Sequence, residues 1–185
     1  AAPASAQTCN VAGKAQCANT TMNWQVKAHD SLKGSDFKGA KLKGADFRNA
    51  NLTKANFKGA VLTSADFRNA NLTKVNFTGA KLKYADFTGA TMTKAQLTKA
   101  KSSNANFTGV SLQKSKLKNG NFENSNFYGA DLTGANLAGS NQVPPPPPFG
   151  PQTKAKVTTD LTNANLYGAT LSGANLKNVN LDNAI

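Results

Sequence analysis

Large apolar residues recur along this chain at every fifth position. They run from Leu32 to Leu137 in 22 consecutive units that alternate mostly between Leu and Phe, and Ser102 is the only polar residue among them. A small residue, usually Ala, lies two positions before each large one, and the other three positions are mostly polar or Gly. A period of five fits neither an α-helix, with about 3.6 residues per turn, nor an alternating strand, with a period of two. The pattern therefore predicts neither of the ordinary elements.

The complete pattern closes only after twenty residues. LTKANFKGAVLTSADFRNAN, residues 52–71, returns with few changes as LTKVNFTGAKLKYADFTGAT, residues 72–91. If each five-residue unit forms one side of a square coil, its large residue and the small residue two before it both point inward, because side chains alternate along extended backbone. Each residue then stacks on the residue twenty positions later, about 4.8 Å away. The sequence predicts an all-β fold, a quadrilateral parallel β-helix over residues 30–141.

This coil places the large residues in four inward columns, with the two Phe-rich columns facing each other across the axis. A buried Leu or Phe stabilises the fold by roughly 1.5–3 kcal/mol, so four of them supply about 6–12 kcal/mol per coil before the entropy cost is subtracted. The columns are Leu32, Leu52, Leu72, Met92, Leu112 and Leu132; then Phe37, Phe57, Phe77, Leu97, Leu117 and Leu137; then Leu42, Leu62, Leu82, Ser102 and Phe122; and last Phe47, Phe67, Phe87, Phe107 and Phe127.

Several units carry a known signature. ADFRN, ANLTK, ANFKG, ADFTG, ADLTG, ANLAG and ANLYG match the pattern A(D/N)LXX or A(D/N)FXX, and the chain therefore resembles the pentapeptide-repeat proteins over residues 30–141 and 159–185. The resemblance implies a right-handed quadrilateral β-helix, but it implies little about function, because these proteins share a rod and differ in what they touch. Some relatives are acidic mimics of duplex DNA. A net charge of +13, from 22 Lys and Arg against nine Asp and Glu, argues against that role here.

Residues 1–29 form a leader outside the repeats. The opening AAPASAQTC is typical of a chain from which a signal peptide has been removed, so we expect an exported protein, at the cell surface, outside the cell, or in a periplasm or lumen. Cys9 and Cys17 are the only cysteines, and a disulfide between them is predicted, with two free thiols as the alternative. Trp24 is expected to help the leader cover the first coil. No apolar stretch is long enough to predict a transmembrane segment.

A proline-rich segment interrupts the repeats. Five consecutive prolines within NQVPPPPPFGPQTKAKVTTD, residues 141–160, predict a stiff loop over residues 142–158 that cannot join a β-ladder. Leu161 lies 24 residues after Leu137, which is one short of a multiple of five, so the register must change. We expect Gln142 to take a place in the third column and the coils to resume over residues 159–185. Phe149 is the expected anchor of the loop, which is either a spacer packed along the rod or a ligand for an aromatic groove.

Two outward columns carry charge. One is a lysine ladder that suits an anionic polymer, such as a polysaccharide, lipid headgroups or nucleic acid; the alternative is a solvated face that discourages aggregation. Its members are Lys54, Lys74, Lys94 and Lys114. The other column contains Asp46, Asp66 and Asp86, with Arg48 and Arg68 two residues further on. Converging carboxylates could bind a hard cation, but bonds from these side chains to the backbone of the corners are favoured.

The sequence offers no support for catalysis. His29 is the only histidine and Glu123 the only glutamate, so no Ser-His-Asp set, paired glutamates or zinc ligand set is present, and no enzyme activity, cofactor, metal or small-molecule substrate is expected. The favoured hypothesis is an exported, rigid structural rod that binds copies of itself end to end or side by side. Its candidate assembly contacts are Trp24, Phe149, Leu181 and Ile185. The alternative is a periplasmic or lumenal binding module whose basic faces hold an anionic polymer or an acidic protein.

Overall fold

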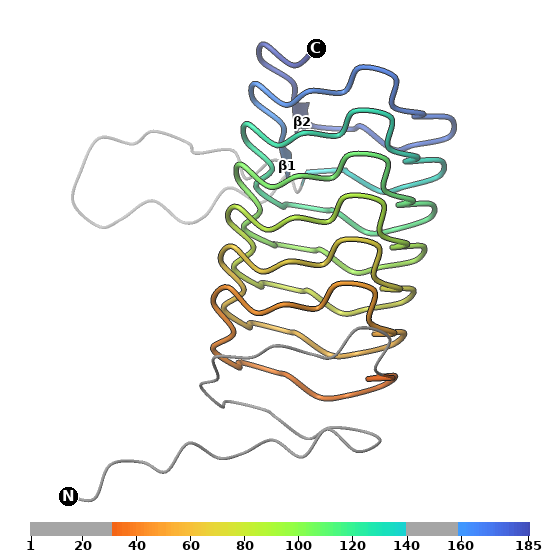
Figure 1. The fold of residues 1–185 in the computed structure, drawn as a ribbon. Helices are drawn as coiled ribbons and strands as arrows, with labels where there is room; N and C mark the ends of the chain where they lie inside the picture. The colour runs from red at the N-terminus through yellow and green to blue at the C-terminus, as the bar shows by residue number, and fades with distance from the viewer. Residues whose placement is uncertain (1–30, 140–158) are drawn as a thin grey trace, which may run out of the picture.

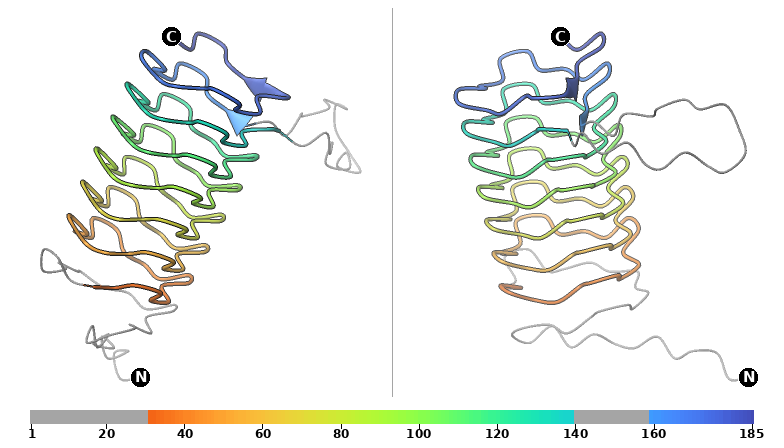
Figure 2. Two further views of the ribbon diagram at one scale, coloured as in Figure 1. Left: turned by 90° about the vertical axis from the view of Figure 1, so that its right-hand side faces the viewer. Right: turned by 180° about the vertical axis from the view of Figure 1, so that it is seen from behind.

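The repeats form one continuous stack of coils. The computed structural model describes residues 31–139 and 159–185, and these rise along a single axis from the first coil to the last (Figure 1). Two further views show the same rod from the side and from behind (Figure 2). Within the described ranges, no helix is both long enough and apolar enough to cross a membrane.

Parallel bridges between neighbouring coils set the register. Each bridge from Ser31↔Asn51 to Lys116↔Asn136 joins residues twenty positions apart. The backbone hydrogen bonds lie on either side of these bridges: Leu32 N–H donates to Asn51 O at 2.8 Å, and Asn56 N–H donates to Ser35 O at 2.9 Å. Each coil therefore bonds to the coils above and below it, as expected for a solenoid.

Extended backbone is shorter than the square-coil hypothesis assumed. The described residues contain two strands, β1 (Thr159–Asp160) and β2 (Val179–Asn180), which pair in parallel, and elsewhere the coils meet through single-residue bridges. The reason is that almost every five-residue unit also contains a turn. From Leu32 to Leu132, and again from Leu161 to Leu181, the second residue after each large one has a positive φ, for example Gly44 (φ 67°) and Asn49 (φ 58°), which reverses the chain and leaves one residue per unit to bridge.

The predicted inward columns form the core. The large residues from Leu32 to Leu137 and the Ala, Val and Ser residues two positions before them have at most 2% of their surface exposed. Phenylalanines of one column stack on the next coil, as Phe67 does on Phe87 with ring centroids 5.0 Å apart, and they meet the facing column edge-on, as Phe37 meets Phe47 at 5.9 Å. The two Phe-rich columns therefore contact each other across the axis, in geometries that aromatic rings prefer.

One place in the core departs from the repeat. Ser102 is fully buried in the third column, and its hydroxyl has no hydrogen-bond partner. The next coil has Phe122 in that column and Gly120 two residues before it, where a Cβ would overlap the Phe122 ring. The large Phe122 ring thus lies beside the small Ser102 side chain, and the absence of a Cβ at Gly120 leaves room for that ring.

The lap that includes the proline-rich segment has a different length. Bridges Asn126↔Asn165, Asp131↔Thr170 and Asn136↔Asn175 join residues 39 positions apart, after which Thr159↔Val179 returns to twenty. Gln142, which we expected in the third column, lies outside the described residues, and buried Leu161 occupies the place 39 positions after Phe122. The described coils before and after the loop therefore continue one stack.

Candidate functional site

Four outward faces follow from the four inward columns. We call the exposed side chains that flank the first inward column the first face, and name the second, third and fourth faces in the same way. Between residues 31 and 122, the first, second and third faces carry five lysines each and at most one carboxylate. The lysines are, face by face, Lys33, Lys54, Lys74, Lys94 and Lys114; Lys38, Lys58, Lys99, Lys116 and Lys118; and Lys41, Lys43, Lys81, Lys83 and Lys101.

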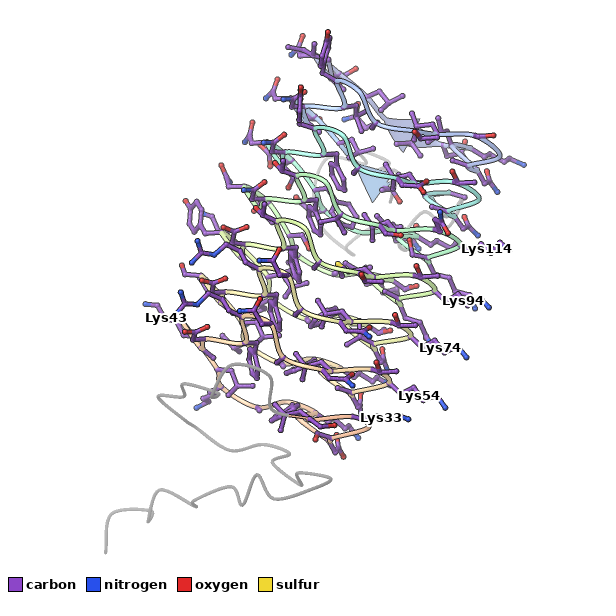
Figure 3. All side chains as sticks on the ribbon, turned by 45° about the vertical axis from the view of Figure 1, so that its right-hand side comes forward. Lys33, Lys43, Lys54, Lys74, Lys94 and Lys114 are labelled. Carbon is purple, nitrogen blue, oxygen red and sulfur yellow. The ribbon has the colours of Figure 1, made fainter. Side chains whose placement is uncertain are left out.

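The predicted lysine ladder forms a single line on the first face. Lys54, Lys74, Lys94 and Lys114 are exposed and follow one another on successive coils, with Lys33 at the foot of the line (Figure 3). Each of the four occupies a turn position with φ between 55° and 62°. An L-residue in this left-handed conformation costs about 1–2 kcal/mol, so these four side chains stand at strained corners.

Neutral polar side chains flank the ladder. On one side lie Asn51, Asn71, Thr91 and Ser111, and on the other Thr53, Thr73, Thr93 and Gln113, so no carboxylate lies among them. The first carboxylate along this face is Asp131, which accepts a hydrogen bond from Gln113 Nε2 at 2.5 Å. Hydrogen bonds from Thr133 and Gln113 hold the pKa of Asp131 below its ordinary value, so it is a carboxylate at neutral pH.

The third face is also basic but less regular. Lys43 lies on the opposite side of the coil from the ladder (Figure 3). Val61 and Thr63 interrupt the lysine columns of this face. Its exposed Tyr84 lies beneath Lys83, whose Nζ is 4.7 Å from the ring centroid, a cation–π contact.

The aspartates of the fourth face stabilise turns. The sequence favoured this role over that of a cation site. Asp46 Oδ1 accepts a bond from the backbone N–H of Arg48 at 3.0 Å, and Asp66 does the same for Arg68. Each arginine also pairs with its own aspartate at 2.6 Å, Nη2 to Oδ2. The side-chain hydrogen bond from Arg48 is the main cause that lowers the pKa of Asp46. In the described part of the chain, no group of three His, Cys, Asp or Glu side chains could hold a metal ion.

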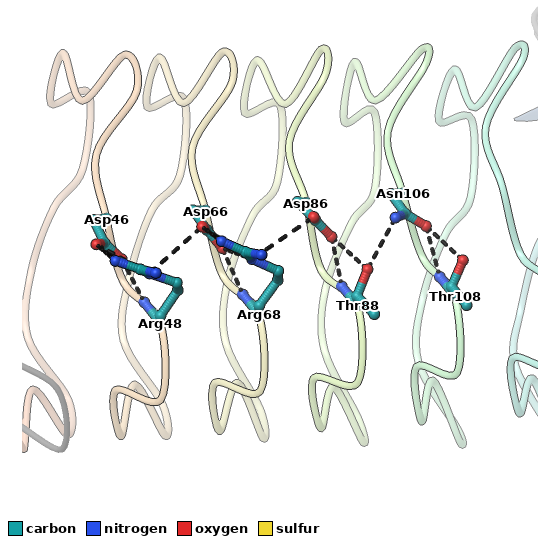
Figure 4. A network of polar contacts seen from close by, with 8 residues as sticks. All are labelled: Asp46, Arg48, Asp66, Arg68, Asp86, Thr88, Asn106 and Thr108. Carbon is teal, nitrogen blue, oxygen red and sulfur yellow. Dashed lines mark hydrogen bonds and ion pairs between the residues drawn. The ribbon is translucent and has the colours of Figure 1, made fainter.

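These contacts join into a chain that crosses coils. Arg48 Nε lies 3.6 Å from Asp66 Oδ2, and Arg68 Nε lies 3.9 Å from Asp86 Oδ2 (Figure 4). Further along, Thr88 Oγ1 donates to Asp86 and accepts from Asn106 Nδ2 at 2.9 Å. The fourth face is thus a polar ladder whose charges are paired within the rod.

The same face ends in two aromatic residues. Tyr128 and Tyr167 are 49% and 66% exposed, and their rings stack with centroids 5.7 Å apart and an interplanar angle of 15°. The twenty-residue spacing of the repeats does not predict this pair, because Tyr128 and Tyr167 are 39 positions apart. The contacts of Arg48 and Arg68 to the next coil were also missed, although their own twenty-residue spacing was visible.

The other predicted site residues are divided between described and undescribed segments. Leu181 and Ile185 are 42% and 80% exposed on the last described coil, and their role in assembly stays a prediction. Cys9, Cys17, Trp24 and Phe149 lie outside the described residues, and so does His29. The disulfide and the leader and loop contacts therefore also stay predictions.

Comparison with known proteins identifies the family. The family model described as a pentapeptide repeat region matches residues 30–107, and the model of pentapeptide repeats in eight copies matches residues 105–141 and 159–185. No curated protein matches the chain. Among solved structures, QnrB1, a plasmid-mediated fluoroquinolone resistance protein, is 26% identical, with 87% of this chain and 79% of that chain covered and a TM-score of 0.54.

Two other solved structures come from photosynthetic organisms. A pentapeptide repeat protein from the thylakoid lumen of Arabidopsis thaliana is 35% identical, with 58% of this chain and 65% of that chain covered and a TM-score of 0.33. HetL, involved in regulating heterocyst differentiation in the cyanobacterium Nostoc, is 20% identical, with 90% and 87% covered and a TM-score of 0.23. The family match supports a fold and does not by itself assign a function. With its repeats matched over most of its length, this chain belongs to the pentapeptide repeat family, and it folds as the right-handed β-helix of that family.

Proposed function

We propose that this protein is a non-enzymatic rod that binds a linear acidic polysaccharide along its first face. The observation that carries the proposal is the unbroken run of Lys54, Lys74, Lys94 and Lys114 on four successive coils, with no carboxylate among the side chains beside it. No other lysine column of the described residues continues over four successive coils. The ladder therefore presents a line of positive charge to which a line of negative charge is complementary.

The repeat distance favours a polysaccharide. Stacked phenylalanine rings on successive coils have centroids 4.6–5.2 Å apart, which indicates the rise from one coil, and so from one lysine, to the next. A uronic acid polymer carries one carboxylate per sugar ring, and a sugar ring is about as long as this rise. Flexible lysine side chains absorb the remaining mismatch, and the flanking Asn and Thr side chains are suited to hydrogen bonds with sugar hydroxyls.

The chemistry of the face argues against single-stranded nucleic acid. Proteins that bind single strands combine positive charge with aromatic side chains on which bases stack. Among the described residues, the first face has no aromatic residue. A cation–π contact between a lysine and an aromatic ring, that of Lys83 with Tyr84, lies on the third face instead.

The proposal includes the finer geometry and the location of the protein. We take each coil to be four-sided and twenty residues long, which is supported by four turns per lap and bridges twenty residues apart. We take the protein to be exported, which is supported by its even number of cysteines, Cys9 and Cys17, because a disulfide persists in an oxidising compartment. Acidic polysaccharides occur outside the cytosol, so the location and the ligand are consistent.

A self-assembling structural rod is the second candidate function. The observation that favours it is the exposure of the apolar residues Leu181 and Ile185 on the last described coil. Polymers that lengthen with protein concentration in negative-stain images would support it. A particle of fixed size over the same concentrations would reject it.

Calorimetric titration with polygalacturonate tests the binding function. The variant K54N/K74N/K94N/K114N removes the ladder and keeps the turns, because Asn already occupies equivalent positive-φ positions such as Asn49 and Asn69. The matched control, K38N/K58N/K99N/K118N, removes the same charge from the second face. We expect the ladder variant to lose at least tenfold in affinity and the control much less. Since each ionic contact to a flexible chain contributes about 0.7 to the slope of log K against log salt, the slope should fall by about three for the ladder variant.

Three outcomes would overturn the proposal. The first is no binding of polygalacturonate, and the second is an equal loss of affinity in both variants. The third is tighter binding of single-stranded DNA of matched charge, which would indicate a nucleic-acid ligand instead. Circular dichroism of both variants checks that the β-helix is intact.

A further inference from the structure

The fourth face differs from the other three in charge. It has two arginines against three aspartates, so its net charge is −1, whereas the first, second and third faces carry five lysines each between residues 31 and 122. Two copies of a chain with a net charge of +13 repel each other, and the repulsion is least where the fourth faces meet. The charges of this face are also paired already, so covering them exposes no free ion to a dry interface.

The residues of the fourth face are arranged in a definite order along the axis. Its outer column is Arg48, Arg68, Thr88, Thr108, Tyr128 and Tyr167, and the column beside it is Asp46, Asp66, Asp86, Asn106, Asn126 and Asn165. Both columns change character at the middle of the rod. The outer column changes from arginine through threonine to tyrosine. The column beside it changes from aspartate to asparagine.

We propose that a second copy of this chain packs on the fourth face in the antiparallel direction. The two-fold axis lies in the interface, between the coil of Thr88 and the coil of Thr108. This symmetry places Arg48 against Tyr167 of the second copy, Arg68 against its Tyr128, and Thr88 against its Thr108. In the neighbouring column, every aspartate meets an asparagine.

Each of these pairs is chemically complementary. A guanidinium that already holds a carboxylate keeps a flat surface and further N–H donors, and a tyrosine can meet both with its ring and its hydroxyl. An amide can donate to the carboxylate that faces it. Tyrosine and arginine are the residue types enriched in protein interfaces, and here Tyr128, Tyr167, Arg48 and Arg68 have about half or more of their surface or side chain exposed.

The charge along the rod favours the antiparallel direction over the parallel one. Residues 31–122 carry 17 Lys and Arg against four carboxylates, a net charge of +13, whereas residues 123–185 carry three lysines against four carboxylates, a net charge of −1. Parallel packing would place the two strongly basic segments side by side. Antiparallel packing places the end of each copy that bears little charge beside the basic end of the other, and a two-fold contact of this kind closes as a dimer.

The inference does not depend on the polysaccharide proposal. The lysine ladder lies on the first face, which the dimer leaves uncovered. Loss of polygalacturonate binding and loss of dimers are separate observations on separate variants, so either proposal can fail alone.

Sedimentation analysis of the full chain over a range of concentrations tests the interface. We expect a monomer–dimer equilibrium in the wild type. The double variant Y128T/Y167T, which extends the threonines of the same column, should weaken the dimer at least tenfold, whereas Y84T, which removes the exposed tyrosine of the third face, should leave it unchanged. A wild type that stays monomeric at all concentrations would overturn the inference, and so would an equal effect of both variants.

Cross-linking tests the direction. The Arg48→Cys and Tyr167→Cys variants are prepared separately and mixed, so that the mixed dimer keeps one arginine–tyrosine contact and places two new thiols together. We expect a disulfide between these two positions only in the mixture, identified by peptide mapping because Cys9 and Cys17 are present in every sample. In an antiparallel dimer the two copies of residue 48 are five coils apart, about 24 Å, and cannot be linked. A disulfide in the Arg48→Cys variant alone would indicate parallel packing and reject the inference, as would the absence of a link in the mixture.

Discussion

Replacing Ser102 by alanine should stabilise the protein. Ser102 lies between Leu82 and Phe122 in the third inward column, fully buried, and its hydroxyl has no partner. A buried polar group without a hydrogen bond costs about 1–3 kcal/mol, and alanine removes that group while leaving the backbone bonds in place. We expect the free energy of unfolding to rise by about 1–2 kcal/mol. For a chain of this length, the melting temperature should rise by roughly 2–4 °C per kcal/mol.

Two other buried serines provide matched controls. Ser115 Oγ donates to Leu112 O at 2.6 Å, and Ser125 Oγ donates to Ser102 O at 2.7 Å. The Ser115→Ala and Ser125→Ala variants each lose a hydrogen bond and should be less stable by about 0.5–1.5 kcal/mol. Guanidinium denaturation followed by circular dichroism measures all three variants. The reasoning fails if Ser102→Ala is destabilised as much as the controls, because the hydroxyl must then have a partner such as a buried water.

Three further predictions concern turns, packing and acid. Lys94→Gly should raise the free energy of unfolding by about 0.5–1 kcal/mol, because glycine adopts a φ of 60° without strain. Lys58→Gly, at a turn position without positive φ, should lower the free energy of unfolding by about the same amount in the same denaturation assay. Gly120→Ala should destabilise by about 1–3 kcal/mol through overlap with Phe122, and a Phe122→Leu background should remove most of that penalty. The pKa of Asp46 is lower in the folded chain than in the unfolded chain, so the Asp46 carboxylate stabilises the fold above about pH 3.8. This stabilisation is lost as the pH falls below that value. In a series of melting temperatures measured against pH, Asp46→Asn should flatten the acidic part of the curve.

The inward half of the structure could be predicted from the sequence because packing leaves it little freedom. A position that must fill a narrow core accepts Leu, Phe or Met, and a position at a corner accepts Ala, so the five-residue pattern and its closure after twenty residues are visible without coordinates. Ser102 was visible as an exception. Its consequence was not, because the compensation by Phe122 and Gly120 comes from the next coil.

The outward half was less predictable. A column of lysines or aspartates can be read from the sequence, but contacts within it depend on side-chain length and direction. Asp46 and Arg48 are two residues apart, and only the coordinates show that the arginine also reaches Asp66 on the next coil. The strained backbone of Lys54 was likewise hidden, because at equivalent turn positions glycine gives the expected signal and lysine does not.

The stack of tyrosines shows what sets the outward surfaces. Tyr128 and Tyr167 meet because Phe127 N–H bonds to Asn165 O at 2.7 Å and Gly129 N–H bonds to Tyr167 O at 3.0 Å, although the lap between them has 39 residues. Bonds between coils therefore align the columns, and sequence spacing predicts the alignment only where a lap has twenty residues. It follows that a change in the number of residues between 140 and 158 should leave both the lysine ladder and the fourth face aligned, whereas a single-residue deletion inside a repeat shifts inward side chains to the surface and misaligns every face beyond it.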